Sequence, residues 1–314
     1  RIDISIKEDL IEEVGRIYGV DNIEGKNLEL PVKNGSYDKV KREIRNKMMN
    51  LGLHETLSYV LVNPEESPMF TNKNNESIKI LSPLTIEKSE LRQSIITSLH
   101  KIYQYNKARS NDDITLFEIG KAFYKNGDEY VEENKLACLM TGTYNTGLHT
   151  ANVDFYIIKG VAEELLCDLG YEGRYHFNVN DKIPEDLHPG KSAIINIDGK
   201  DVGIIGRINP SICDDDVYVM EINLEKLNLI RTGNMKYKEI SKFPSVRKDL
   251  AVIVDKNITA EELLKGIKNG GGKLLQSAKV FDVYTGKTIL AGKKSIAFSL
   301  ELSDPNKTMT DEEI

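Results

Sequence analysis

The feature that most constrains the fold is a series of strand patterns in the middle of the chain, several of them separated by very short turns. Asn126-Gly127 and Gly199-Lys200 each separate two such patterns. Asn-Gly is a strong hairpin signal because both central residues of the tight turn need positive φ. Strands joined by hairpins form antiparallel sheets, so this region predicts an antiparallel α+β domain. The strand patterns lie at residues 114–120, 121–125, 135–142, 192–198, 201–208 and 217–224.

Helical patterns precede and interrupt these strands. The first helix has Ser5 and Glu8 at the spacing of a capping box, and Gly19 is a natural end for it. Further apolar stripes at helical spacing predict helices at about residues 38–51, 91–107 and 157–169, and residues 56–62 predict a strand. The cations at positions 39–47 either form a solvated face or contact RNA phosphate.

Composition excludes several classes of protein. The chain has 314 residues, 40% of them hydrophobic and 29% charged, as in ordinary globular proteins. No apolar run approaches the roughly 18 residues that span a bilayer, and the three cysteines lack metal-binding spacing. With neither a secretory signal nor an initiator Met, we expect a cytoplasmic protein without a membrane segment, given as a piece of a longer chain.

Charge is distributed unevenly along the chain. The net charge is −7, but residues 231–314 hold 15 Lys and Arg against 11 Asp and Glu, a balance of +4. A modestly basic last domain on an acidic body suits a domain that meets phosphates.

The last 73 residues predict a strand, a helix and a second strand, with a third strand following. Their lead-in contains Lys242, Phe243, Arg247 and Lys248. Cations beside a ring suit a single-stranded RNA, whose bases stack while its phosphates pair; alternatively, Phe243 packs at the hinge and the cations stay solvated. A ferredoxin-like unit needs one more helix, which we expect to begin near Thr310, and a closing strand.

These strings carry a resemblance to a known family. KFPSVRKDLAVIV and VFDVYTGK resemble the ferredoxin-fold anticodon-binding domain of the bacterial phenylalanyl-tRNA synthetase β chain. The strings at residues 3–23, 81–99, 109–123 and 188–210 resemble other parts of the same chain. The resemblance implies an α+β fold: an antiparallel, non-catalytic class II synthetase-like domain followed by a truncated ferredoxin-like domain. Its implied boundaries are 1–30 for the tail of a small α/β domain, 37–230 for the catalytic-like domain, 231–241 for a linker and 242–314 for the anticodon-binding domain.

An acidic cluster lies on the first predicted helix. Asp9 faces Glu12 and Glu13 at i+3 and i+4, where like charges repel and a hard cation would relieve the cost. Spacing alone favours a solvated acidic face at the helix N-terminus, with Glu12 paired to Arg16. The resemblance implies that Asp3, Asp9, Glu12 and Glu13 bind Mg²⁺ in a structural or intersubunit role.

The catalytic-like domain departs from a working class II site. Class II synthetases place an arginine at the end of the second-motif strand to hold the ATP α-phosphate, and Tyr124 occupies that position here. A neutral phenol cannot replace a charged, bidentate guanidinium. A Gly-rich strand ending in arginine is also missing, and residues 217–227 occupy its place. We therefore expect no catalytic residue in this chain.

The resemblance implies a subunit of phenylalanine–tRNA ligase, a class II aminoacyl-tRNA synthetase. In that family two α and two β chains assemble, the α chain binds ATP and charges tRNA(Phe), and the β chain supports the α chain and binds tRNA. The domains that carry editing lie outside this sequence. Two alternatives remain open: a free-standing tRNA- or RNA-binding module without a catalytic partner, and a metabolic ligase that binds ATP despite Tyr124.

Overall fold

The computed structural model describes residues 3–26, 35, 39–71, 75–146, 149–232, 241–286, 289–290 and 292–310. It divides into two compact units, Arg1–Gly233 and Asn234–Ile314. Among the described residues, none of the helices is long and apolar enough to cross a membrane.

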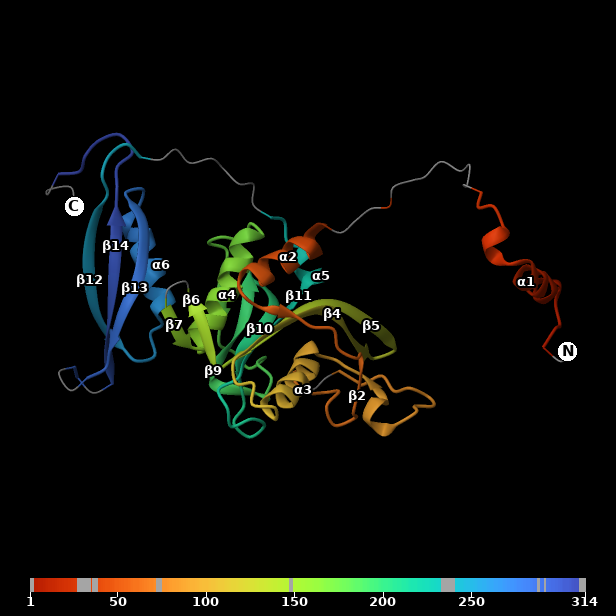
Figure 1. Ribbon diagram of the computed structural model, residues 1–314. Helices are drawn as coiled ribbons and strands as arrows, with labels where there is room; N and C mark the ends of the chain where they lie inside the picture. The colour runs from red at the N-terminus through yellow and green to blue at the C-terminus, as the bar shows by residue number, and fades with distance from the viewer. Residues whose placement is uncertain are drawn as a thin grey trace. The chain divides into compact units, whose positions relative to one another are not determined.

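A seven-stranded sheet forms the centre of the first unit (Figure 1). All neighbouring strands in it are antiparallel except β1 and β4, which are parallel. The predicted antiparallel α+β fold is therefore confirmed. In sheet order the strands are β1 (His54–Glu55), β4 (Ile114–Asn126), β5 (Glu129–Thr141), β11 (Tyr218–Asn223), β10 (Lys200–Ile208), β9 (Leu187–Ile197) and β8 (Tyr175–Asn178).

Helices cover both faces of this sheet. Figure 1 shows α2 (Lys39–Asn50) and α4 (Phe155–Asp168) on one side of the strands and α3 (Ile95–Lys107) on the other. Each side has its own apolar core: Ile44 and Met48 of α2 belong to one, and Ile95 and Leu99 of α3 to the other. The short helix α5 (Leu224–Asn228) follows β11 and adds Leu224 and Leu227 to the α2 side.

The hairpin turns fall one residue away from their predicted positions. Lys200 pairs with Ile197, so the turn residues are Asp198 and Gly199, both with positive φ (49° and 81°). In the β4–β5 hairpin Asn126 pairs with Glu129, and Gly127 begins the turn. In each hairpin, the paired strands therefore extend one residue further towards the turn than the sequence indicated.

The segment before α3 differs from the prediction. We expected a helix from residue 91, but Glu90–Leu91 form strand β3, which pairs with β2 (Leu61–Val62). The helix begins at Ile95, after Ser94, whose hydroxyl accepts a hydrogen bond from the backbone N–H of Ile96 at 3.1 Å. The predicted strand at residues 56–62 is likewise limited to β2, with β1 just before it.

The first helix, α1 (Lys7–Tyr18), also begins one residue later than predicted. Ile6 is its N-cap, and the carboxylate of Asp9 accepts from the backbone N–H groups of Ser5 and Ile6 at 2.8 and 2.9 Å. The predicted pairing of Ser5 with Glu8 is therefore wrong. The remaining short elements are η1 (Val20–Asn22), η2 (Ile86–Lys88), β6 (Thr143–Thr146) and β7 (His149–Asn152).

The second unit has the predicted strand, helix, strand, strand order. Its elements are β12 (Val246–Asp255), α6 (Ala260–Gly271), β13 (Leu275–Tyr284) and β14 (Lys293–Leu302). The sheet order is β12-β14-β13, so β14 is central. Thr259 and Glu262 form a capping box at the start of α6. Thr310 is not helical, and the rest of the helix expected there lies outside the described residues.

Candidate functional sites

The class II-like surface is the face of the seven-stranded sheet that α3 covers. Tyr124 lies there, and its hydroxyl donates to Glu133 Oε1 at 3.1 Å. Burial, followed by the carboxylates of Glu133, Glu129 and Glu225, raises the pKa of Tyr124 to about 12. The phenol therefore stays neutral at pH 7, and its surroundings are acidic. A triphosphate at this position would meet repulsion where a working site provides an arginine.

A buried ion pair lies on the same side of the sheet, under the start of α3. Arg92 Nη2 lies 2.7 Å from Glu118 Oε1, and both side chains are almost fully buried. The other guanidinium nitrogens donate to Ser58 Oγ at 2.6 Å, Ser98 Oγ at 3.1 Å and the Lys121 carbonyl at 3.0 Å. Gly120 leaves room for this pair, since an added Cβ would lie 2.6 Å from Arg92 Nη2. The guanidinium is thus committed to the protein itself.

A second buried carboxylate fills the space at the start of α3. Glu221 Oε1 accepts from Ser94 Oγ at 2.8 Å and from the Ile95 backbone N–H at 2.7 Å. Glu221 Oε2 pairs with Lys135 Nζ at 3.0 Å. A helix N-terminus with a nearby lysine attracts an anion, and here the protein supplies that anion. Sequence reasoning missed Arg92, Glu118 and Glu221, because no local spacing marks partners 26 or more positions apart.

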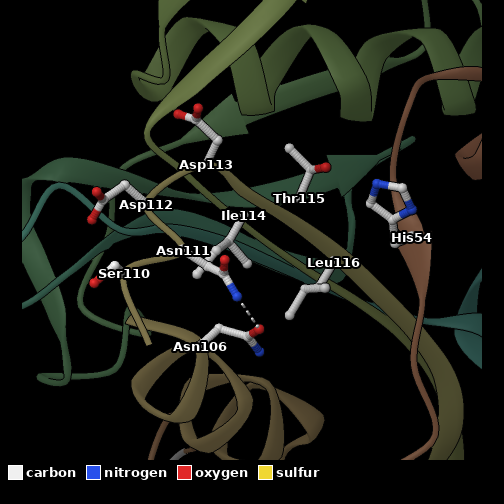
Figure 2. A pocket seen from close by; sticks show the side chains of 9 residues that line it. All are labelled: His54, Asn106, Ser110, Asn111, Asp112, Asp113, Ile114, Thr115 and Leu116. Atoms are coloured by element: carbon white, nitrogen blue, oxygen red, sulfur yellow. Dashed lines mark hydrogen bonds between the residues drawn. The ribbon is translucent and has the colours of Figure 1, made fainter. Parts of the chain in front are cut away.

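A pocket of about 400 Å³ opens elsewhere on the first unit, between the end of α3 and the start of β4 (Figure 2). Several of its polar groups already have hydrogen-bond partners: Asn111 donates to Asn106 at 3.2 Å, and Asp113 accepts from the Thr143 backbone at 2.6 Å. This pocket carries no catalytic arrangement. It is lined by His54, Asn106, Ser110, Asn111, Asp112, Asp113, Ile114, Thr115 and Leu116.

The four acids predicted to bind Mg²⁺ do not form one group in the structure. Asp9 caps α1 through two backbone N–H groups, which hold the pKa of its carboxyl below the usual value. Arg16 Nη2 lies 2.7 Å from Glu13 Oε2. Arg16 therefore pairs with Glu13, whereas the sequence analysis paired it with Glu12. Within the described part of the chain, which includes Asp3, Asp9, Glu12 and Glu13, no three acids, histidines or cysteines form a group that could hold a metal.

The basic face of α2 is mostly engaged within the first unit. Arg45 Nε lies 2.7 Å from Glu55, and Lys47 Nζ lies 2.8 Å from Asp168. Lys41 donates to Asn134 at 2.8 Å. These three cations have partners within the first unit, which counts against an RNA-binding face on α2.

The four predicted tRNA-binding residues do not share one surface. Lys242 and Phe243 precede β12 and are exposed and half-buried, respectively. Arg247 and Lys248 are consecutive strand residues, so their side chains point to opposite faces of the sheet. Arg247 pairs in register with Glu301, on the face opposite that of the buried Ile296 and Phe298.

Two further residues lie on the same open face as Arg247. Lys279 is opposite Ser299 and Tyr284 is opposite Ser295, on the odd-numbered side of β14. Both are at least partly exposed. The face therefore combines two cations and a ring with the carboxylates of Asp249, Asp282 and Glu301. A β-bulge between Val280 and Asp282 made the register of β13 unpredictable from alternation alone.

Fold and site together define a class of protein: a class II synthetase-like α+β domain followed by a ferredoxin-like domain. Residues 28–224 match the family described as "Phenylalanyl tRNA synthetase beta chain CLM domain", and residues 241–314 match "Ferredoxin-fold anticodon binding domain". The chain belongs to the phenylalanyl-tRNA synthetase β chain family, which confirms the resemblance found in its sequence.

Named relatives match this chain over its full length. Proteins named phenylalanine–tRNA ligase beta subunit are 34% identical in Geobacillus kaustophilus, 35% in Bacillus subtilis and 37% in Bacillus licheniformis, each over 100% of this chain. The chain spans only 40% of the length of each of these relatives. A solved pyrrolysyl-tRNA synthetase from Desulfitobacterium hafniense matches 61% of this chain and 65% of its own, with 14% identity and a TM-score of 0.46, too low to support an argument.

Proposed function

We propose that this chain is part of the β subunit of phenylalanine–tRNA ligase, where it scaffolds the catalytic α chain and binds tRNA(Phe). The observation that carries the proposal is a family match covering both units, combined with a class II-like surface closed by the protein's own charges. ATP is bound and phenylalanine activated by the α chain, in a cytoplasmic assembly of two α and two β chains.

Co-expression with the α chain tests the scaffold role. We expect the two chains to co-purify, and light scattering of the purified material to give the mass of a species containing both. Separate elution of the two chains would favour the free-standing RNA-binding module instead.

The metabolic-ligase alternative predicts that ATP binds this chain directly. Tyr124 and its three neighbouring carboxylates oppose a triphosphate, so Mg-ATP should leave the unfolding temperature of the isolated chain unchanged. A ligand that binds the native state raises that temperature through mass action. A concentration-dependent rise with Mg-ATP, absent with Mg²⁺ alone, would support the ligase alternative and count against the scaffold.

For tRNA binding we propose the open face of the second sheet, centred on Arg247, with Lys242 and Phe243 at its entry and Lys279 and Tyr284 on β13. Support comes from their placement: cations and a ring on one exposed side suit phosphates and a stacked base. Lys248 points to the other face and is the weakest member of the predicted set.

Salt-dependent binding to tRNA(Phe) distinguishes these residues. Arg247→Ala should weaken binding and reduce the slope of log K against log salt by about 1, the loss of one phosphate contact. Lys265→Ala is the matched control, because Lys265 lies on α6 and pairs with Glu261. Equal slopes for the two variants would place the tRNA elsewhere.

Magnesium at Asp3, Asp9, Glu12 and Glu13 remains a family-based proposal. These oxygens suit a hard cation, but two of the acids already have other partners in the described arrangement. Calorimetric titration with Mg²⁺ should give a binding signal that Glu12→Gln together with Glu13→Gln abolishes. No signal from the unsubstituted chain would remove the proposal.

A further inference from the structure

Three Asn-Gly pairs occur in this chain, and each of them follows a lysine. They are Asn34-Gly35, Asn126-Gly127 and Asn269-Gly270. An asparagine side-chain amide reacts most readily with the next backbone nitrogen when glycine follows, because glycine has no Cβ to shield that nitrogen or to restrict its approach. Since the same residues flank all three asparagines, their intrinsic reactivity is closely similar, and the fold decides which of them reacts.

Asn126-Gly127 lies at the tip of the β4–β5 hairpin, and both residues are exposed. Asn126 makes the last strand pair, with Glu129, and Gly127 begins the turn with a φ of 61°. A Cβ placed on Gly127 would meet no atom within 4 Å beyond its chain neighbours. Among the described residues, neither the Asn126 side chain nor the Gly127 N–H has a hydrogen-bond partner. The amide and the nitrogen that would attack it are therefore both accessible.

Asn269-Gly270 is equally exposed but lies inside helix α6. In an α-helix each backbone N–H donates to the carbonyl four residues earlier, so the Gly270 nitrogen is held in a hydrogen bond. The Cα–Cβ bond of a helical residue also tilts towards the helix N-terminus, which directs the Asn269 side chain away from the nitrogen that follows it. The helix therefore protects this pair although solvent reaches it. Asn34 lies outside the described residues.

The other hairpin turn shows how the fold can protect a similar pair without a helix. Asp198-Gly199 forms the β9–β10 turn. Arg174 Nε lies 3.2 Å from Asp198 Oδ2, and the Gly199 N–H donates to Asn196 Oδ1 at 2.9 Å. Both reacting groups of this pair have partners. A hairpin turn alone therefore does not make such a pair reactive, and the tip at Asn126 differs by leaving both groups unbonded.

We infer that Asn126 is a site of spontaneous deamidation. The Gly127 backbone nitrogen loses its proton to solvent base and attacks the side-chain carbonyl carbon of Asn126. A C–N bond forms, and the side-chain nitrogen leaves as ammonia. Water then opens the resulting five-membered succinimide at either of its two carbonyls, which gives aspartate or isoaspartate. The net change consumes one water and releases one ammonia, with no oxidation or reduction.

Each product changes the hairpin tip in its own way. Aspartate adds a negative charge beside Asp128 and Glu129. Isoaspartate adds a methylene to the main chain, which disrupts the pairing of Asn126 with Glu129. The backbone of Lys125 also exchanges hydrogen bonds of 2.9 and 3.0 Å with that of Glu76, so the disruption reaches the neighbouring segment. We therefore expect the end of the hairpin to loosen as the protein ages.

Peptide mapping of the aged full chain tests the inference. Native chain is kept at mildly alkaline pH and digested so that Asn126 and Asn269 fall in separate peptides, and mass spectrometry with fragment ions locates the conversion. We expect Asn126 to convert at least fivefold faster than Asn269. In urea, where neither pair is folded, the two rates should agree within twofold. Equal rates in the native chain, or a faster rate at Asn269, would overturn the inference.

The variant Asn126→Gln tests the consequence for the hairpin. Its side chain keeps the amide, but the ring that it would close has six members and forms far more slowly. Hydrogen exchange in peptides covering the β4–β5 tip should become faster as the unsubstituted chain ages and should stay constant in the variant. Peptides of β9 and β10 report unfolding of the whole first unit and should change in neither protein. An equal increase at the tip in both proteins would overturn the claim that deamidation loosens it.

Discussion

The two units of this chain use a β-sheet in different ways. In the first, helices cover both faces of seven strands, and the interior holds Arg92, Glu118 and Glu221 among its buried residues. In the second, three strands bury one face around Ile296 and Phe298, and the opposite face stays open. Charges can be buried only where enough surrounding structure satisfies them, and an open sheet face is available for a ligand.

The contrast is clearest at the class II-like surface of the first unit. A class II-like sheet would present an open, charged surface to ATP. Here the corresponding surface is closed by ion pairs within the chain, and the exposed groups beside it are apolar. The second unit keeps an open polar face with Arg247 and Lys279. The two surfaces suit the protein contacts proposed for the first unit and the RNA contacts proposed for the second.

The largest expected effect comes from breaking the buried ion pair. Arg92→Met leaves the Glu118 carboxylate buried without its partner and should cost about 3–5 kcal/mol of unfolding free energy in the first unit. The double variant Arg92→Met/Glu118→Leu should recover most of that loss. Hydrogen exchange measured on peptides of β4 and of β14 reports the two units separately.

The exposed Arg45–Glu55 pair is the control for this experiment. It lies at 2.7 Å with side chains 36% and 27% exposed, so Arg45→Met should cost no more than about 1 kcal/mol. Protection in β14 should not change in any of these variants. Equal losses in the single and double variants would show that the pair does not act as a unit.

A smaller change in the stability of the first unit is expected when low pH favours protonation of His100. This side chain is buried between Phe70 and Tyr103, and burial lowers its pKa. Below the ordinary pKa of about 6.5 the unfolded chain binds a proton that the folded chain resists. Stability of the first unit therefore falls as pH drops from 7 towards the lowered folded pKa, by at most about 1.4 kcal/mol per pH unit for one proton.

The variant His100→Leu removes this contribution. Its stability difference between pH 7 and pH 5 should be smaller than that of the unsubstituted chain, measured by urea unfolding at both pH values. His54→Gln is the control, because His54 is exposed. A pH dependence identical in all three proteins would mean that His100 accepts its proton without cost.

The smallest effect concerns the cap of α6. Thr259 Oγ accepts from the Glu262 N–H at 3.2 Å, and Glu262 reaches back to the Thr259 N–H at 2.7 Å. Thr259→Ala should cost about 1 kcal/mol in the second unit alone. The expected readout is faster exchange in α6 and β14 with unchanged exchange in β4. An equal change in β4 would contradict the separation into two units.

Sequence patterns predicted the sheet and most helices because these depend on local periodicity and turn residues. They failed where a distant contact decides the structure. Leu91 lies at helical spacing from Ile95, yet Leu91 pairs with Leu61 in a strand. Arg92 turns into the interior to meet Glu118. The N-cap of α1 lies one residue later than predicted, because the carboxylate that accepts from the backbone N–H groups of Ser5 and Ile6 is that of Asp9 and not that of Glu8.

The candidate sites show the same difference between local sequence signals and distant contacts. Tyr124 could be singled out because a motif fixes its position in the chain. The buried network of Arg92, Glu118 and Glu221 could not, because its partners are far apart in the sequence: Glu221 lies 127 positions from Ser94. Arg247 and Lys248 looked equivalent in the sequence, and only the strand places them on opposite faces.

ATP–pyrophosphate exchange with phenylalanine tests the central claim most directly. The purified chain, the α chain and the two chains together are assayed at equal concentrations. The account predicts exchange at the buffer background for this chain alone, and exchange well above background when both chains are present. Exchange above background from this chain alone, retained after Tyr124→Phe, would contradict the claim that its class II-like domain is a scaffold.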